Sequence, residues 1–231
     1  MASPDSPPLL LSDNDVPATP SNASSEYESL SPADVLKKLE EAWCNELLAP
    51  ELLDHKTEIV EVVMEQVRAM LLHIQEENLS RVRGDSFVAG IHKLELERIK
   101  YVLCSYLRTR LKKIEVNVIF VLEEEANKES SAGSKLSPEE LVYAKEFADN
   151  MKVHMETLVL RHMPSSFQTL DHKKAATAPS LDSFVFARAV ENVDDIAINE
   201  DTQVSMSPGM QVIAPYHPLS TLVQSGALQL I

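Results

Sequence analysis

The chain has 231 residues, of which 44% are hydrophobic and 25% are charged, and its formal net charge is −15. Such an acidic chain gains little from counterion release at a phosphate backbone, which disfavours autonomous nucleic-acid binding. No apolar run approaches the roughly 18 residues of a membrane-spanning helix, and two cysteines without a visible secretory signal indicate reduced thiols in an intracellular protein.

The first 30 residues differ in composition from the rest. Residues 1–30 are rich in Pro, Ser and Asp, and they carry five acidic residues but no Lys or Arg. Such a segment cannot bury enough apolar surface to offset the entropy that it loses on ordering. The composition therefore predicts a disordered acidic tail over residues 1–30.

Two helix starts use the same sequence device, LSPADVL from Leu30 and LSPEELV from Leu136. In each stretch the serine can cap a helix, the proline suits the first helical position, and the acid three residues after the serine can complete a capping box. The leucine before the serine can pack on the apolar residue five positions later as a hydrophobic staple. We expect helices to begin at about residues 32 and 138.

Apolar residues with helical spacing fill the region between and after these starts. One pattern runs from Ile59 to Ile74, a long helix is predicted from about Asp85 to Glu124, and another covers roughly residues 138–162. Helical periodicity with short breaks indicates an antiparallel bundle. We therefore predict a helical A domain over residues 31–164.

The pattern changes after this bundle. Residues 165–179 resemble a linker, and residues 180–231 contain short alternating strands in DSFVFARA, DDIAINE and VSMSPGMQVIAPY, then a helical turn, a stop at Gly226 and a final strand. The predicted fold class is mainly α, with an N-terminal helical bundle followed by a small β-rich B domain over 180–231. About 50 residues bury little surface alone, so we expect the B domain to lean on something else.

The predicted long helix has a wide apolar face. It consists of seven residues at steps of three and four: Leu96, Ile99, Leu103, Leu107, Leu111, Ile114 and Val118. Val102 and Tyr106 widen this face to roughly half of the circumference, whereas a helix with one neighbour needs only about 100°. We therefore expect several helices to cover it, from the same chain or from other subunits.

The basic residue Arg110 falls inside this apolar face. A buried and unpaired guanidinium costs several kcal/mol, so its side chain must snorkel to water or find a carboxylate. Two partners are open: an acid of the same chain, or an acid across a subunit interface.

Three other basic residues lie on the polar face of this helix, Arg98, Arg108 and Lys112. An alternative function is direct DNA binding through the basic residues of the 98–113 helix. Phosphate tracking requires a clustered basic face, often with exposed aromatic residues, but Glu97 and Glu115 border this one. The pattern therefore favours protein partners over DNA.

The sequence contains no recognisable catalytic or cofactor motif. The seven histidines are scattered without an H-E-x-x-H pair, and neither a phosphate-binding loop nor a G-x-S-x-G elbow is present. The cysteines do not have zinc-site spacing. We expect a protein that is not an enzyme, with no catalytic residue, cofactor or metal.

Several separated stretches together resemble one family, the Sld-five-type subunit of the GINS complex. LSPADVLKKLEEAWCNELLAPELL resembles the start of that subunit, and IHKLELERIKYVLCSYLRTRLKKIE resembles its long central helix. SPEELVYAKEF and LVQSGALQLI resemble its fourth helix and its C-terminal strand. The resemblance covers roughly residues 30–231, and the 192–208 region matches poorly.

The resemblance implies a helical A domain, a small β-rich B domain and a heterotetramer with three other GINS subunits. It also implies a non-catalytic scaffold in the nucleus, which joins the MCM hexamer and a RecJ-like accessory factor into the replicative helicase for initiation and elongation of DNA replication. The complex would link this motor to polymerases and replisome adaptors. The subunit would contact DNA only indirectly and no membrane.

The candidate subunit-interface residues come from the first helix, the central helix and the last strand: Trp43, Tyr106, Leu107, Arg108, Arg110, Leu111, Ile114, Leu228, Leu230 and Ile231. Trp43 is the only tryptophan, and it can anchor either the core or an interface. A further hypothesis is that the B domain packs against a sister subunit and helps to assemble the tetramer.

Overall fold

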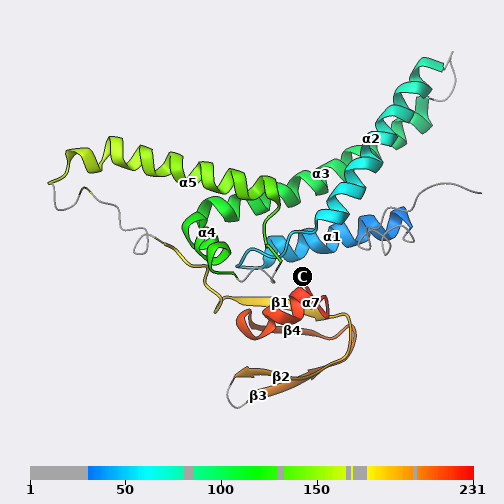
Figure 1. Cartoon of the computed structure of the whole chain (residues 1–231). Helices are drawn as coiled ribbons and strands as arrows, with labels where there is room; N and C mark the ends of the chain where they lie inside the picture. Colours follow the sequence, from blue (N-terminus) through cyan, green and yellow to red (C-terminus); the bar gives the residue numbers. More distant parts are fainter. Residues whose placement is uncertain (1–30, 81–85, 129–132, 165–167, 169–175, 200–201) are drawn as a thin grey trace, which may run out of the picture.

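The computed structural model describes residues 31–80, 86–128, 133–164, 168, 176–199 and 202–231 (Figure 1). The predicted tail over 1–30, with the staple residue Leu30, lies outside the described residues, as does most of the predicted linker. The proposed domain boundaries at 31–164 and 180–231 therefore stay predictions.

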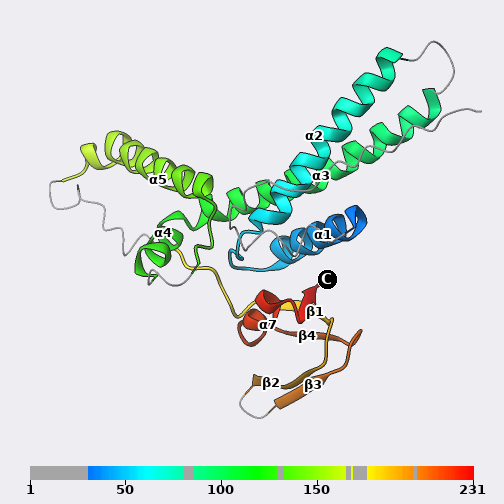
Figure 2. The ribbon, with the colours of Figure 1, turned by 45° about the vertical axis from the view of Figure 1, so that its right-hand side comes forward.

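The N-terminal region is helical, as predicted. Its elements are α1 (Pro32–Leu48), α2 (Thr57–Ser80), α3 (Ser86–Val116), α4 (Val118–Asn127), α5 (Pro138–Leu158) and a 3-10 turn η1 (Leu160–His162). Helices α2 and α3 lie side by side and project beyond the start of α1, whereas α5 extends in a different direction (Figures 1 and 2). The helical part therefore has two arms that meet above α1.

Both predicted helix starts are confirmed. The Ser31 hydroxyl accepts a hydrogen bond from the backbone N–H of Asp34 at 3.3 Å. At α5 the capping box is complete, because the N–H of Glu140 donates to the Ser137 hydroxyl at 3.1 Å and the N–H of Ser137 donates to the Glu140 carboxylate at 3.0 Å.

The prediction of one helix from Asp85 to Glu124 was wrong. The backbone leaves helical geometry at Asn117, with φ −118° and ψ 29°, and α4 begins at Val118. Asn117 lies between Val116 and Val118. The two β-branched valines have reduced helix propensity, and the amide side chain of Asn117 competes for backbone hydrogen bonds. The bend turns α4 so that buried Val118 and Val121 pack in one cluster with Ala144 of α5.

Two apolar clusters cover the wide face of α3 within the chain. Val35 and Leu39 of α1 and Ile59 and Val63 of α2 pack on the middle of α3, and a second cluster joins Ile114 to α4 and α5. Every residue of the predicted face is buried or half-buried. Several helices do cover it, but they belong to the same chain, so this face does not itself require a partner.

The C-terminal part holds the predicted strands. They are β1 (Phe184–Ala189), β2 (Val193–Asn199), β3 (Thr202–Met206), β4 (Gln211–Pro215) and β5 (Leu228–Leu230), with a 3-10 turn η3 (His217–Leu219) and the short helix α7 (Ser220–Ser225) before β5. One antiparallel sheet has the order β4-β1-β5, and β2 pairs with β3 as a separate hairpin.

Local sequence signals account for this part well. In β1 the residues Val185, Ala187 and Ala189 are buried and alternate with exposed residues, as the predicted alternation requires. Gly226 ends α7 in the left-handed conformation with φ 84°, which favours glycine.

Candidate subunit interface

Arg110 is the centre of a buried ionic network inside the chain. Its guanidinium is fully buried and donates five hydrogen bonds of 2.7–3.0 Å, to the carboxylates of Glu46 and Glu140 and to the carbonyl oxygens of Leu53 and Lys135. These groups come from α1, from the two segments that precede α2 and α5, and from α5 itself. Of the two partners left open by the sequence, the structure contains the one within the chain.

The electrostatics of this network are mutually stabilising. Burial alone would lower the pKa of Arg110, but the hydrogen bonds to Glu140 and the charges of Glu46 and Glu140 outweigh it and raise the pKa above its ordinary value. Burial likewise tends to raise the pKa of Glu140, yet Arg110 and the Ser137 N–H lower it overall. Both groups are therefore charged at neutral pH.

The network continues towards the strands of the C-terminal part. Lys113 Nζ donates to the Glu46 carboxylate at 2.8 Å and to the carbonyl oxygen of Glu51 at 2.7 Å. The hydroxyl of Tyr216 donates to the Glu51 carboxylate at 2.8 Å. Tyr216 is buried, and burial together with the Glu51 charge raises its pKa above its ordinary value, so this hydroxyl is a permanent donor.

The C-terminal part also leans directly on α1. The N–H of Leu230 in β5 donates to the side-chain oxygen of Asn45 at 2.8 Å, and Ala49 and Leu53 belong to the apolar cluster of the strands. Figure 1 shows the sheet below α1. The support that the sequence led us to expect is therefore provided, at least in part, by the same chain.

The structure divides the ten candidate interface residues into two groups. Tyr106, Arg110, Ile114, Leu228 and Leu230 are at most 1% exposed, so the chain itself covers them. The residues with accessible surface are Trp43, Leu107, Arg108, Leu111 and Ile231. Only the second group can touch a partner directly, and their role in an interface stays a prediction.

Trp43 is half-buried between α1 and α3. Its indole N–H donates to the Ser105 hydroxyl at 3.0 Å, and its ring stands edge-on to Tyr101 with centroids 6.2 Å apart. Trp43 also packs against the cluster shared by α1, α2 and α3. It therefore anchors the core on one side and leaves its other side at the surface.

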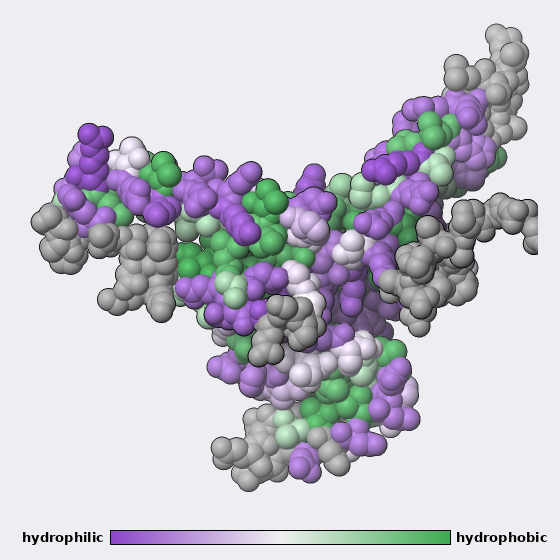
Figure 3. Space-filling view, in the orientation of Figure 1, coloured by the Kyte–Doolittle hydropathy of each residue, from purple (hydrophilic) through white to green (hydrophobic). Residues whose placement is uncertain are grey.

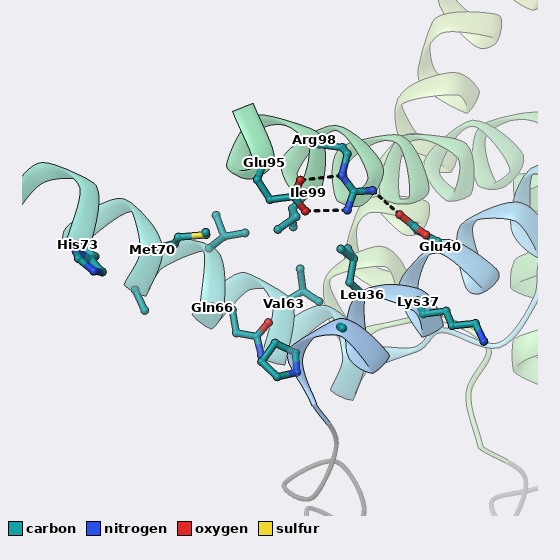
Figure 4. A pocket seen from close by; sticks show the side chains of 14 residues that line it. Leu36, Lys37, Glu40, Val63, Gln66, Met70, His73, Glu95, Arg98 and Ile99 are labelled. Carbon is teal, nitrogen blue, oxygen red and sulfur yellow. Dashed lines mark hydrogen bonds and ion pairs between the residues drawn. The ribbon is translucent and has the colours of Figure 1, made fainter. Parts of the chain in front are cut away.

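A groove of about 780 Å³ opens where the α2–α3 arm extends past the start of α1. Its floor is apolar, with Leu36, Val63 and Ile99 pointing into it (Figure 4). On its rim, Arg98 lies between Glu95 and Glu40 and makes ion pairs of 2.8 and 2.6 Å with them (Figure 4). An apolar floor with a paired, charged rim suits the docking of apolar side chains better than it suits catalysis.

A second groove, of about 500 Å³, lies between α2, α3 and α5. Leu107 and Leu111, two of the candidate interface residues, line it together with Met64 and Tyr143. Burial lowers the pKa of His55 at its edge, so this imidazole is neutral at physiological pH. The groove is thus a second mainly apolar surface, further along α3 than the first groove.

Sequence reasoning missed the most exposed apolar residues of the helical part. On the first half of α3, Phe87 is 80% exposed, Leu94 is 73% and Tyr101 is 66%. Figure 3 shows hydrophobic residues at the surface of the α2–α3 arm, near α4 and α5, and on the strand part. Phe87, Leu94 and Tyr101 repeat every seven residues in the sequence. The prediction was based instead on the apolar face of α3 that α1 and α2 cover.

The outer face of the sheet is also apolar. Phe184 is 72% exposed and Phe186 is 57%, and Phe186 lies opposite Ile213 of β4, which is 58% exposed. The hypothesis that the strand part packs against a sister subunit stays a prediction, and this face is the surface that remains open for it.

The DNA-binding footprint is weaker in the structure than in the sequence. Arg98 is paired with Glu95 and Glu40. Of the three bases in the footprint, only Arg108 and Lys112 are therefore exposed without an ion pair in the described part of the chain.

Among the described residues, no group of three or more His, Cys, Asp or Glu side chains is placed to hold a metal ion. No helix in this part of the chain is long and apolar enough to cross a membrane. Of the two cysteines, Cys104 is exposed and Cys44 is half-buried.

Comparison with known proteins matches both parts of the chain. The family described as GINS complex protein helical bundle domain matches residues 64–159, and the family described as DNA replication complex GINS protein SLD5 C-terminus matches residues 179–231. The chain is 43% identical to the DNA replication complex GINS protein SLD5 of Rattus norvegicus and of Homo sapiens over 217 residues, which is 91% of this chain and 95% of each relative. The protein of the same name from Dictyostelium discoideum is 30% identical over 85% of this chain and 92% of its own length.

Proposed function

The chain belongs to the SLD5 family of GINS subunits, and on this premise we propose that it is a non-catalytic structural subunit of the heterotetrameric GINS complex. Its relatives are named as members of a DNA replication complex, so its role lies in DNA replication. We further propose that it assembles with three other GINS subunits in the nucleus, and that the tetramer joins the MCM hexamer and a RecJ-like accessory factor as a scaffold of the replicative helicase.

The observation that carries this proposal is the extent of the match. Identity of 43% runs over 91% of this chain and 95% of the human relative, so the match spans most of the helical part and of the strand part. Arg110, Glu140 and Tyr216 of the buried network lie within the two regions that the family models match. A chain that shares its fold with these relatives over most of its length is expected to assemble into the same kind of complex.

Exposed apolar surface supports a role in assembly. Phe87, Leu94 and Tyr101 on α3 and Phe184 and Phe186 on β1 are between 57% and 80% exposed. Contiguous apolar patches on a soluble protein commonly mark interaction sites. The acidic net charge of −15 also favours protein partners over nucleic acid, because a phosphate backbone would repel most of this surface.

Reconstitution tests the proposal. The chain is co-expressed with the three other GINS subunits of its own organism, and the purified material is analysed by size-exclusion chromatography with light scattering. We expect one species with the summed mass of the four chains. A chain that elutes alone, while the other three subunits are recovered normally, would contradict the proposal.

The helicase role is tested at the next level. The purified tetramer is mixed with the MCM hexamer and the RecJ-like factor, and ATP-dependent unwinding of a forked duplex is measured. We expect unwinding to need all components and the tetramer alone to hydrolyse no ATP. Full unwinding without the tetramer, or turnover by the tetramer alone, would overturn the scaffold role.

A further inference from the structure

Proline-directed protein kinases modify a serine or threonine that is directly followed by proline. The chain contains six such residues: Ser3, Ser6, Thr19, Ser31, Ser137 and Ser207. The first three lie outside the described residues, and the structure describes the other three. A kinase takes its substrate serine with an accessible hydroxyl on an extended backbone. Exposure, backbone conformation and hydrogen bonding therefore decide which of the three described serines a kinase can reach.

Ser31 meets these requirements. Ser31 and the three residues after it are all exposed, and the backbone at Ser31 is extended, with φ −68° and ψ 152°. Its hydroxyl donates to the Asp34 carboxylate at 2.6 Å and accepts from the Asp34 N–H at 3.3 Å. Both contacts are with one exposed neighbour in the first turn of α1. Helix ends fray readily, so the hydroxyl becomes free when only this turn opens.

Ser137 has the same local sequence but is closed to a kinase. It is 6% exposed, and its hydroxyl accepts from the N–H of Glu140 at 3.1 Å. The Glu140 carboxylate in turn accepts from the Ser137 N–H and from the buried guanidinium of Arg110. A phosphate on Ser137 would add an anion to this buried network without a further cation, which is costly. Access to Ser137 therefore needs unfolding at the start of α5.

Ser207 is exposed but lies in a tight turn between β3 and β4. The N–H of Met210 donates to the carbonyl oxygen of Ser207 at 3.0 Å, and Gly209 has φ 86°. With Pro208 at the second position, these are the features of a type II turn. The chain reverses directly after the serine, so it does not present the extended backbone that a kinase takes.

We propose that Ser31 is the phosphorylation site of a proline-directed serine/threonine kinase in the folded part of this chain. In the reaction the Ser31 Oγ attacks the γ-phosphorus of ATP, the bond from this phosphorus to the bridging oxygen breaks, and ADP leaves. The hydroxyl proton passes to the carboxylate base of the kinase. This inference goes beyond the proposed function and does not depend on it.

The fold can carry this modification. A phosphoserine has a charge of about −1.5 to −2 at neutral pH, and it lacks the hydrogen that Ser31 donates to Asp34. Repulsion turns the Asp34 carboxylate towards water, which is possible because Asp34 is exposed. The N-terminus of a helix favours negative charge. These two effects oppose each other, so we expect α1 to persist after phosphorylation.

The phosphate also changes the charge at one end of the groove of about 780 Å³, because Pro32 and Ala33 belong to its lining. Two basic and two acidic side chains of this lining balance each other in charge: Lys37, Arg98, Glu40 and Glu95. Phosphorylation of Ser31 makes this end of the groove negative.

A kinase assay on the full chain tests the proposal. The probe is a mitogen-activated protein kinase with ATP, and the modified residues are mapped by tandem mass spectrometry. In a variant with Ser3→Ala, Ser6→Ala and Thr19→Ala, we expect phosphorylation of Ser31. Addition of Ser31→Ala to this variant should abolish it. Phosphorylation of residues 1–30 in the unmodified chain serves as the control for kinase activity.

Short synthetic peptides that contain each described serine remove the effect of the fold. We expect the kinase to modify all three peptides. In the folded chain Ser31 should react within about tenfold of its peptide, whereas Ser137 and Ser207 should react at least about a hundredfold more slowly than theirs, because they must first open. The phosphorylated chain should keep its circular dichroism spectrum and melt within about 4 °C of the unmodified chain.

Three results would overturn the inference. The first is no phosphate on Ser31, in the chain or in its peptide, while residues 1–30 are phosphorylated. The second is reaction of Ser137 and Ser207 in the folded chain at their peptide rates, because structure would then not select the site. The third is loss of the helical spectrum on phosphorylation of Ser31.

Discussion

Removal of the buried guanidinium of Arg110 should destabilise the protein strongly. Arg110→Met keeps an unbranched apolar stem but leaves the carboxylates of Glu46 and Glu140, which are 1% and 6% exposed, without their shared cation. Breaking a buried ion pair by removing one partner costs about 3–5 kcal/mol. For a chain of this size each kcal/mol lowers the melting temperature by about 2–4 °C, so we expect a decrease of about 6–20 °C.

Thermal unfolding of the reconstituted complex, followed by differential scanning calorimetry, measures this effect. The matched control is Arg98→Met on the same helix, where the side chain is 48% exposed and pairs with two acids at the surface. Surface pairs contribute about 0–1 kcal/mol each, so loss of these two should lower the melting temperature by less than about 8 °C and by less than Arg110→Met does. Equal effects of the two substitutions would refute the central role of the buried network.

The pH dependence supplies an independent check. In the unmodified protein Arg110 holds the pKa of Glu140 below its ordinary value, so this carboxylate contributes stability above about pH 4.5 that is lost as the pH falls through the lowered pKa. In Arg110→Met the burial of Glu140 is no longer offset by the guanidinium, and its pKa rises. The deficit of the variant should therefore shrink as the pH is lowered from 7.5 to 5, and a constant deficit would count against this reasoning.

Three further substitutions test single features of the fold by the same melting measurement. Tyr216→Phe removes the hydroxyl that donates to Glu51 and should cost about 1.5–3 kcal/mol and speed proteolysis of the strand part; unchanged proteolysis would argue against this tie. Gly226→Ala places a side chain at φ 84° and should cost about 1–2 kcal/mol, so an unaffected melting temperature would show that the turn relaxes freely. Ser137→Ala removes one half of the α5 capping box and should cost about 1 kcal/mol, and a neutral result would mean that water replaces the cap.

Local signals in the sequence predicted much of the fold. The serine, proline and acid at the start of α5 predicted its first turn, because capping depends only on residues within one turn. The alternation around Val185 predicted β1 and its buried side, and Gly226 predicted the stop before β5. These features were accessible because short-range backbone geometry determines them.

The features that the sequence did not predict depend on residues far apart in the chain. The bend at Asn117 depends on the packing of α4 against α5. The apolar periodicity of the sequence continues through Asn117 and does not indicate the bend. The partners of Arg110 lie 30 and 64 residues away, so the sequence could pose the question of a carboxylate partner but could not choose it. The hydrogen bond from Leu230 of β5 to Asn45 joins residues that are 185 positions apart in the sequence. No short sequence motif predicts such a contact.

The candidate interface illustrates the same division. Apolar periodicity finds helix faces but does not say which of two faces the chain itself covers. The face through Leu103 is filled by α1 and α2, whereas Phe87 and Leu94 on another face of α3 are left exposed. Only the three-dimensional arrangement of α1, α2 and α3 decides between them.

Affinity purification of the tagged chain from replicating cells of its own organism, with quantitative mass spectrometry, tests the central claim most directly. We expect the three other GINS subunits in equal amounts to the chain, together with MCM subunits and the RecJ-like factor in smaller amounts. Recovery of the chain alone, or with partners that exclude the other GINS subunits, would contradict its role as a structural subunit of the complex.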